Sequence, residues 1–402
     1  MTLKPIIVAA IAIALTGISA GAPASAQMVS HPTPLADTDG DGIITINKAV
    51  TRPRVARGTD LIACAYPAAP PSWYAVKGTE CPPAPVEPTP DPYAFIQTGK
   101  LFGVNISGLE FASELSVKEA DIDFYADAGV KSIRLPVKRD RLTTEAKLAA
   151  LDALVKRGTD RGILMVIDEH SYGNIGDARI RDFWLRIAPR YKGQPLVAFD
   201  LQNEPNGGTW ASWGPDSRDL IHTLRAAGVD NLLILEWRQS SGASRADKNE
   251  ASTKACESAL CSLNRAGIMT LADLDPLKRT WLSPHRYFDS NGSGTSAYCR
   301  TDLSMSGAFG SSVAAARKLG MRLYLGEFAW GRYGSWPESC KKLAPVIVDY
   351  LKATPEFAGG ASWGWGPRWT KTYTFRGEHF SDRAKTWDTE NARVLARLWA
   401  VD

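Results

Sequence analysis

The chain has 402 residues, of which 44% are hydrophobic and 22% are charged, so it is long enough to bury a large core. Its 47 Lys and Arg and 43 Asp and Glu leave a formal charge of only +4, spread along the chain without basic blocks. The composition gives no reason to expect a nucleic acid or a membrane surface as a partner. No exposed heptad or apolar stripe is evident, and we therefore expect a monomer.

Residues 1–26 have the features of a secretory signal peptide. Lys4 precedes an apolar run from Ile6 to Ile18, and Ala24-Ser25-Ala26 provides the small residues of a cleavage site. A membrane anchor that is not cleaved is the alternative, but the run is shorter than the roughly 20 residues that span a bilayer. We expect a secreted protein, extracellular or periplasmic, whose mature chain starts near Gln27.

The six cysteines of the chain fit an exported protein, because export leads to an oxidising compartment. Their spacings match no zinc pattern, whereas three disulfides would use all of them. The sequence alone leaves several pairings open. We favour pairs of sequence neighbours, which are Cys64 with Cys81, Cys256 with Cys261 and Cys299 with Cys340.

Residues 27–97 show little periodicity and are rich in Pro, which predicts a small irregular extension that acts as a linker or as a strap on the main domain. Within it, Asp37, Asp39 and Asp41 match the first half of a calcium loop. Lys48 stands where such a loop needs a bidentate Glu. We therefore favour a polar turn over a calcium site.

From residue 98 onward, short apolar runs alternate with segments of helical periodicity. Near-continuous apolar strands that alternate with helices are typical of a parallel sheet, and eight such units predict a (β/α)₈ TIM barrel over 98–402. An open doubly wound sheet is the alternative, but no Gly-rich phosphate loop follows the first strand. An irregular insertion, 244–272, follows the fifth strand. The predicted strands are 101–106, 131–136, 163–168, 197–204, 232–236, 279–285, 321–328 and 357–365.

Polar residues cluster at the carboxyl ends of the predicted strands, which in a parallel barrel meet at one mouth. The fourth strand ends in Asn203 and Glu204, and Pro205, which has no N–H to donate, stops it abruptly. The seventh strand ends in Glu327. The other candidates at strand ends are Arg134, His170, His285, Tyr287 and Trp363.

Two carboxyl groups on opposite sides of a barrel mouth suggest hydrolysis of a glycosidic bond, which needs one protonated and one ionised carboxyl group. We expect a retaining double displacement in which Arg134 and Tyr287 keep Glu327 ionised. A lone Glu at a strand end is more often part of a structural salt bridge, but two in this context favour catalysis. Neither a zinc-type His pair nor a Gly-x-Ser-x-Gly elbow is present at a strand end, so we expect no metal, no other cofactor and no serine nucleophile.

Several of these segments together resemble glycoside hydrolase family 5, and their order is most similar to that of its secreted endo-β-1,4-glucanases, or cellulases. The resemblance covers about residues 100–370 and implies cleavage of internal β-1,4 linkages of cellulose or a related β-glucan. The matching segments are 103–108, 133–136, 168–170, 202–205, 285–295, 326–327 and 362–363.

By this resemblance, Glu204 is the acid/base and Glu327 is the nucleophile. Asn203 would bind the sugar 2-hydroxyl, His170 and His285 would bind hydroxyl groups or water near the acid/base, and Trp363 would floor the central subsite. Asn105, in the first matching segment, is a further substrate-binding candidate. Among the 13 tryptophans, those that fall just after strand ends are candidate platforms for sugar rings. These are Trp237 and Trp330, together with Trp210, Trp213 and Trp369.

The sequence also departs from the family pattern in ways that bear on substrate choice. Ser171 stands where the glucanases usually have Asn, and Arg368 lies in an unusually Trp-rich eighth loop. The insertion 244–272 adds a third difference. The same chemistry on mannan, xylan or a decorated glucan therefore stays open as an alternative, as does, more remotely, a polysaccharide-binding barrel without activity.

Overall fold

The structure, a computed structural model of the chain, describes residues 91–110, 116–247, 256–292, 294–331, 336–370, 373–376 and 390–399, together with five short strands nearer the N-terminus. The chain divides into two compact units, Met1–Pro90 and Asp91–Asp402. The predicted signal peptide, the acidic turn at 37–41 and the Cys64–Cys81 pair lie outside the described residues. No helix within the described ranges is long and apolar enough to cross a membrane.

In the first unit, the described backbone forms short antiparallel strands. β5 (Trp73–Val76) pairs with both β1 (Val29–Ser30) and β4 (Leu61–Ala63). β2 (Ile43–Thr45) pairs with β3 (Arg54–Ala56). These short strand pairs lie within the Pro-rich extension predicted at residues 27–97. Each of them is too short for the alternation that identifies a strand in a sequence.

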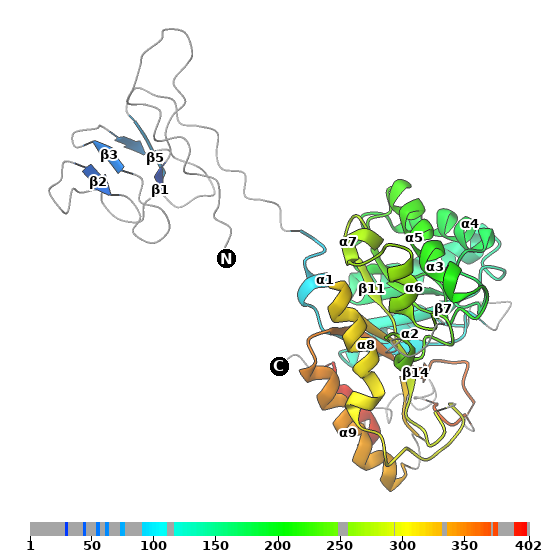
Figure 1. Cartoon of the computed structure of the whole chain (residues 1–402). Helices are drawn as coiled ribbons and strands as arrows, with labels where there is room; N and C mark the ends of the chain where they lie inside the picture. Colours follow the sequence, from blue (N-terminus) through cyan, green and yellow to red (C-terminus); the bar gives the residue numbers. More distant parts are fainter. Residues whose placement is uncertain are drawn as a thin grey trace. The chain divides into compact units, whose positions relative to one another are not determined.

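The second unit is a succession of strands and helices (Figure 1). Its strands are β6 (Leu101–Ile106), β7 (Ser132–Val137), β8 (Leu164–Glu169), β9 (Val197–Asp200), β10 (Leu232–Leu235), β11 (Thr280–Leu282), β12 (His285–Tyr287), β13 (Leu323–Ala329) and β14 (Phe357–Trp365). The helices that follow successive strands are α2 (Glu119–Asp127), α3 (Glu145–Asp160), α4 (Ala178–Ile187), α5 (Trp210–Ala226), α8 (Met305–Leu319), α9 (Glu338–Ala353) and α10 (Glu390–Ala396).

The strands close into a parallel barrel. Neighbours pair in chain order from β6 to β11, and β14 pairs with both β6 and β13. β13 completes the ring, because it pairs with β11 through Leu282 and Leu323 and with β12 through His285 and Glu327. The predicted (β/α)₈ fold is confirmed, and the carboxyl ends of all strands meet at one end of the barrel.

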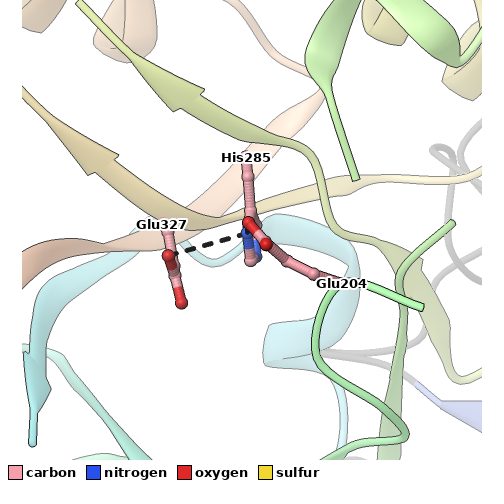
Figure 2. A group of neighbouring side chains, drawn as sticks. All are labelled: Glu204, His285 and Glu327. Atoms are coloured by element: carbon pink, nitrogen blue, oxygen red, sulfur yellow. Dashed lines mark hydrogen bonds and ion pairs between the residues drawn. The ribbon is translucent and has the colours of Figure 1, made fainter. Parts of the chain in front are cut away.

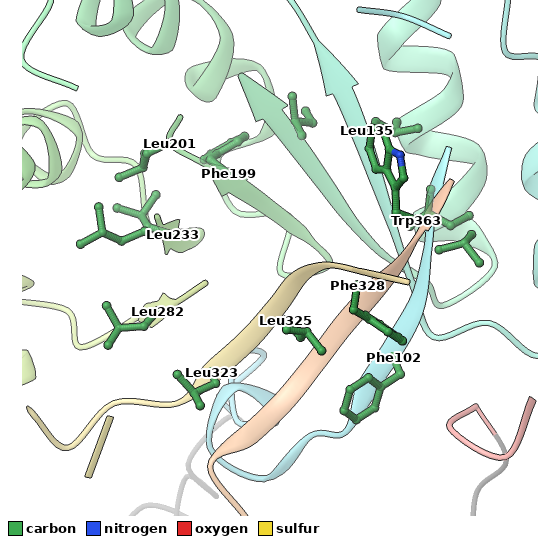
Figure 3. Close-up of a cluster of buried hydrophobic side chains, with 14 of the residues drawn as sticks. Phe102, Leu135, Phe199, Leu201, Leu233, Leu282, Leu323, Leu325, Phe328 and Trp363 are labelled. Carbon is green, nitrogen blue, oxygen red and sulfur yellow. The ribbon is translucent and has the colours of Figure 1, made fainter. Parts of the chain in front are cut away.

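Along each strand, successive residues point in opposite directions, one toward the barrel interior and the next toward the surrounding helices. Residues such as Phe199, Leu233, Leu282 and Leu323 pack with helix side chains in the larger core (Figure 3). Their neighbours in the sequence form a second, smaller apolar cluster inside the barrel. The strand residues of this interior cluster are Leu164, Val166, Ala198, Leu232, Ile234, Trp281, Tyr324, Ala358 and Ala361.

The segment before β6 plugs the amino end of the barrel. Tyr93 and Ile96, the latter in the short helix α1 (Phe95–Thr98), are buried against the interior cluster. The Arg279 guanidinium lies 3.7 Å from the centroid of the Tyr93 ring. Arg322 donates to the carbonyl oxygen of Ile96 at 3.0 Å. The compact unit thus begins at Asp91, several residues before the predicted boundary at 98, because these side chains belong to its core.

The predicted sixth strand is broken in two. β11 ends at Leu282 and β12 begins at His285, because Pro284 between them has no N–H for the ladder. The backbone at the break remains bonded, since Ser283 N donates to Leu235 O at 2.9 Å and Gly326 N donates to Pro284 O at 3.1 Å. β12 therefore enters the barrel mouth in register with the end of β13.

The insertion after β10 is partly helical rather than irregular. It contains α6 (Ala259–Arg265) and α7 (Leu271–Leu274). The Ser258 hydroxyl caps α6 by accepting from Cys261 N, a common way to satisfy the first N–H groups of a helix. The Ser262 hydroxyl then accepts from Gly214 N on α5 at 2.9 Å, which fixes the insertion to the barrel.

Candidate active site

A layer of charged residues lies inside the barrel directly above the interior apolar cluster. On β8, Asp168 follows Leu164 and Val166 in the same alternation. Asp200 ends β9, and Glu236 follows Ile234 at the end of β10. All three carboxyl groups are fully buried. Burial of so many acidic groups requires a cation among them.

Arg134 on β7 supplies that cation. Its side chain has no exposed surface and bonds to four carboxylates. Desolvation by itself lowers the pKa of the guanidinium, but these carboxylates raise it well above its ordinary value, so Arg134 is permanently charged. The contacts are Nε to Asp200 Oδ2 at 2.8 Å, Nη2 to Glu236 Oε1 at 2.9 Å and to Asp168 Oδ2 at 3.1 Å, and Nη1 to Glu327 Oε1 at 3.1 Å.

Glu327, near the end of β13, is held as a carboxylate. Tyr287 Oη donates to Glu327 Oε2 at 2.6 Å, and Arg134 donates to the other oxygen. Burial raises the pKa of Glu327, but the charges of His285 and Arg134 and the Tyr287 hydrogen bond outweigh it, so the pKa lies below its ordinary value. The structure thus brings Arg134 and Tyr287 to Glu327, as the sequence predicts.

Glu204 lies in a strained backbone conformation after β9. Its φ of 41° is in the left-handed region, which costs a residue with a Cβ about 1–2 kcal/mol. A residue before proline ordinarily prefers an extended backbone, so Pro205 does not explain this conformation. The Glu204 N–H donates to Glu236 Oε2 at 2.6 Å, and this charge-assisted bond offsets the strain. β9 consequently ends at Asp200, not at Glu204 as predicted.

His285 lies between the two glutamates (Figure 2). Its Nδ1 is 3.0 Å from Glu204 Oε1 and 3.7 Å from Glu327 Oε2. The three residues each offer an atom within 4.8 Å of the others, so the two carboxyl groups approach one another to at most that distance. The Glu204 side chain keeps 17% of its surface exposed, whereas that of Glu327 keeps 6%.

The other imidazole nitrogen of His285 faces Glu236, at 2.8 Å from Nε2 to Oε1. Burial raises the pKa of the Glu236 carboxyl group. Burial lowers that of His285, but the charges of Glu236 and Glu327 raise it well above its ordinary value. Both pKa directions therefore favour a proton on one of the two groups, shared across the short contact between them.

The two asparagines of the site have different environments. Asn105 Nδ2 donates to Gly326 O and Ala361 O, both at 2.9 Å, and its Oδ1 accepts from Arg134. This fully buried side chain braces the barrel, so the prediction that Asn105 binds substrate is wrong. Asn203 also accepts from Arg134, at 2.9 Å, but its buried Nδ2 has no hydrogen-bond partner among the described residues. Asn203 thus has an unused donor at the mouth.

The His170 ring is held by contacts with Asp168, Tyr172 and Trp363. Its Nδ1 is 2.7 Å from Asp168 Oδ2, and Tyr172 Oη lies 3.3 Å from its Nε2. Desolvation lowers the pKa of His170, which keeps the ring neutral. The Trp363 indole lies nearly parallel to it, at 7° and 5.9 Å between centroids. The structure therefore brings His170 and Trp363 together at the mouth.

The tryptophans after other strand ends are mostly core residues. Trp237 and Trp330 have no exposed surface, and they continue the outward alternation of Leu235 and Phe328, so the prediction that they are sugar platforms is wrong. Trp210 and Trp213 are also buried. Trp369 is only partly buried and stacks on Tyr373 at 3.8 Å between centroids. Tyr373 Oη in turn accepts from Trp363 Nε1 at 2.8 Å.

Sequence reasoning missed the acidic residues that surround Arg134 and the tyrosines at the rim. Glu236 and Asp168 continue the inward alternation of their strands, so the period of two could have identified them. Asp200 follows Ala198 in the same way. Tyr172 and Tyr373 lie on loops and carry no such signal.

Two of the predicted disulfides lie among the described residues, and both are confirmed. Cys256 is bonded to Cys261 beside α6, and Cys299 is bonded to Cys340 on α9. The second bridge ties the loop after β12 to the helix after β13, which restrains the backbone downstream of Tyr287.

Known proteins with similar structures share the barrel. An endo-beta-1,4-glucanase from Xanthomonas axonopodis pv. citri superposes with a TM-score of 0.63 and 23% identity, over 74% of this chain and 98% of that one. Cel5A (EG2) from Hypocrea jecorina superposes with a TM-score of 0.57 and 21% identity, over 70% and 93% of the two chains. At these identities the likeness is one of fold.

Sequence comparisons are more specific. Endo-beta-1,4-glucanase B of Aspergillus niger is 25% identical over 307 residues, which cover 69% of this chain and 82% of the relative. Endoglucanase gh5-1 of Neurospora crassa is 27% identical over 298 residues, which cover 67% and 70%. The family model for Cellulase (glycosyl hydrolase family 5) matches residues 93–368, a span that holds the whole charged layer and both glutamates. The chain therefore belongs to glycosyl hydrolase family 5, the cellulase family.

Proposed function

We propose that this protein is a retaining endo-β-1,4-glucanase in which Glu327 is the nucleophile and Glu204 is the acid/base. The observation that carries the proposal is the pair of carboxyl groups that follow β9 and lie near the end of β13. Their nearest atoms lie within 4.8 Å of one another, and their surroundings differ. Retaining enzymes place the two groups about 5–5.5 Å apart, whereas inverting enzymes leave about 6.5–9.5 Å for a water molecule.

The surroundings assign one role to each glutamate. Glu327 has two hydrogen-bond donors, from Arg134 and Tyr287, and a depressed pKa, which suits a nucleophile that must be ionised. Glu204 is the more exposed of the two and has its carboxyl group beside His285. An acid/base has to exchange its proton with solvent in every cycle, so this exposure suits Glu204.

In the first step, a Glu327 oxygen attacks the anomeric carbon while Glu204 gives its proton to the departing glycosidic oxygen. The bond between carbon and that oxygen breaks, and a covalent glycosyl ester forms on Glu327. In the second step, Glu204 takes a proton from water, whose oxygen attacks the same carbon and releases Glu327. Both steps pass through an oxocarbenium-like centre that the Glu327 charge stabilises.

Three further side chains would contact the sugar at the reacting bond. The unused Nδ2 of Asn203 is placed to donate to the 2-hydroxyl, a bond that strengthens in the transition state of glycosidases. Neutral His170 offers Nε2 to a hydroxyl group, and Trp363 offers an apolar face for the ring. Each contact would position the substrate against the carboxyl pair.

The names of the relatives and the resemblance to secreted cellulases support an unbranched β-1,4-glucan as the substrate. The chemistry uses only side chains of the protein, so we propose that it needs no metal or cofactor. The disulfides and the N-terminal sequence support a secreted protein, and we propose that it acts on the polysaccharide as a monomer.

A decorated glucan is the alternative that one observation favours. A cavity of about 660 Å³ adjoins the end of β8, where Glu169, Ser171 and Tyr172 line it, and would leave room for a side branch of the substrate. Its lining also includes Arg139, Arg179 and Arg186.

The test is release of reducing ends from carboxymethyl-cellulose, mixed-linkage β-glucan, xyloglucan, mannan and xylan. We expect preference for the unbranched β-glucans, with a fast loss of viscosity that reveals internal cleavage. Preference for xyloglucan would favour the decorated substrate, and activity confined to mannan or xylan would keep the mechanism but reject the substrate. The Glu327→Gln variant should bind the polymer without turnover. Turnover by this variant would reject Glu327 as the nucleophile.

A further inference from the structure

Glu236 has a set of contacts that the proposed mechanism does not use. It follows β10, is fully buried, and directs its two carboxylate oxygens at different partners. Oε2 accepts from the Glu204 N–H at 2.6 Å. Oε1 lies 2.8 Å from His285 Nε2 and 2.9 Å from Arg134 Nη2. Glu236 thus contacts Glu204 directly at the backbone N–H of Glu204 and indirectly through the His285 ring.

We propose that Glu236 is a positioning residue that keeps His285 in its doubly protonated form and so directs an Nδ1–H at the Glu204 carboxyl group. This inference rests on the proposed function, in which Glu204 is the acid/base. It adds to the two glutamates a third one that never touches the substrate.

The hydrogen-bond geometry places the proton on the imidazole. Two hydrogen bonds end on the Glu236 carboxyl group, from Glu204 N to Oε2 and from Arg134 Nη2 to Oε1, and His285 Nε2 lies 2.8 Å from Oε1. Hydrogen bonds that end on both oxygens favour the ionised form of a carboxyl group. Nε2 then carries a proton toward Glu236, and Nδ1 carries the other toward Glu204 Oε1, 3.0 Å away.

The charged groups around His285 come from three other segments of the barrel mouth. Glu204 faces it from the segment after β9, Glu236 from β10 and Glu327 from β13. Arg134, on β7, is bonded to two of these carboxyl groups, those of Glu236 and Glu327. Three carboxyl groups around one ring favour the imidazolium. Glu236 is the partner at the shortest distance, and it has no part in the bond cleavage itself.

The consequence for catalysis concerns the moment at which Glu204 loses its proton. When the leaving oxygen takes that proton, Glu204 becomes a carboxylate, and the Nδ1–H of a charged His285 stabilises it. A second effect comes from the backbone. The N–H bond to Glu236 holds Glu204 at φ 41°, the conformation in which its carboxyl group reaches His285.

The Glu236→Gln variant tests both effects, because an amide has only one oxygen and cannot accept on both sides. We expect His285 to lose its second proton near neutral pH. Glu327 then loses a neighbouring positive charge, so its pKa rises. The acid limb of the pH profile of kcat/KM should move upward by about one pH unit, the usual effect of one charged neighbour. The kcat on a polysaccharide should fall about tenfold, with little change in KM.

The matched control is Asp200→Asn. Asp200 is a buried carboxylate of the same layer that bonds to Arg134 at 2.8 Å, but no bond joins it to His285 or to the Glu204 backbone. Removal of the Asp200 charge leaves more of the Arg134 charge to stabilise the Glu327 carboxylate. The acid limb of the profile should therefore not move to higher pH. An upward shift in Glu236→Gln together with none in Asp200→Asn supports the proposal. An unshifted profile in Glu236→Gln, with only a lower thermal stability, overturns it.

A measurement on the unsubstituted protein decides the same question without any substrate. In ¹⁵N-histidine-labelled protein, we expect both ring nitrogens of His285 to carry hydrogen at pH 7, with the signal assigned by its loss in His285→Asn. A singly protonated ring overturns the proposal, even if Glu236→Gln fails to fold. If no polysaccharide is cleaved, the proposed function fails, whereas the spectrum still reports on Glu236 and His285.

Discussion

The hydrogen bond from Tyr287 to Glu327 is the contact whose removal gives the most direct test of the nucleophile. In Tyr287→Phe, the ring can keep its stacking on Phe375, at 5.5 Å between centroids, and only the hydroxyl is lost. A hydrogen bond to a charged group contributes about 1.5–3 kcal/mol. One pKa unit corresponds to about 1.4 kcal/mol. Loss of the bond should therefore raise the pKa of Glu327 by about one to two units.

The sign of the effect on activity follows from the role of Glu327. The nucleophile works ionised, and its depressed pKa places the acid limb of kcat/KM below the ordinary Glu value of 4.5 in the unsubstituted enzyme. In Tyr287→Phe, activity should be lost on acidification at a pH about one to two units higher. The assay is the pH dependence of kcat/KM on a soluble β-glucan.

A control separates this effect from the loss of any tyrosine hydroxyl. Tyr350, on α9, stacks on Phe309 at 5.7 Å between centroids and lies outside the charged layer. Tyr350→Phe should leave the acid limb in place. If the limb stays in place in Tyr287→Phe as well, the hydrogen bond does not set the ionisation of Glu327 and the reasoning fails.

Other contacts give predictions of different kinds. Arg134→Met leaves four carboxylates without their cation, which should lower the free energy of unfolding by about 3–5 kcal/mol or prevent folding. Thermal unfolding measures this loss, and an unchanged unfolding temperature would contradict the role of Arg134 as their counter-ion. Asn203→Ala should lower kcat/KM about 100-fold on an aryl cellobioside but much less on its 2-deoxy analogue, and equal losses on both would show that Nδ2 does not bind the 2-hydroxyl. Cys340→Ser, which opens the bridge to Cys299, should lower the free energy of unfolding by about 2–4 kcal/mol without a change in kcat, as measured by denaturant unfolding; a loss of activity in the folded variant would instead tie the bridge to the site.

The barrel and the pair of glutamates at its mouth could be predicted because both depend on local pattern. Each strand is a short apolar run, and Glu204 and Glu327 stand where such runs end. In a closed parallel barrel, strand ends meet at one mouth whatever the loops do, so the spatial cluster follows from the order of elements. Arg134, Tyr287 and His285 were found for the same reason.

The errors arise where the position of a residue along the chain does not reveal the direction of its side chain. Trp237 directly follows Glu236, yet one side chain enters the helix-facing core and the other enters the barrel, because successive strand residues point to opposite faces. Asn105 lies near a strand end, as the two glutamates do, but its amide donates to backbone carbonyls of β13 and β14. The backbone of Glu204 was the hardest to foresee, since its partner Glu236 lies on another strand.

The plug formed by Tyr93 and Ile96 determines where this enzyme can be cut or joined to another protein. A truncation at residue 98 would remove the stopper from the amino end of the barrel and leave Leu164, Leu232 and Ala358 open to water. A fusion placed just before Asp91 keeps the stopper and lies at the opposite end of the strands from the two glutamates. Replacement of the segment that precedes Asp91, in the laboratory or during evolution, can therefore leave the charged layer unchanged.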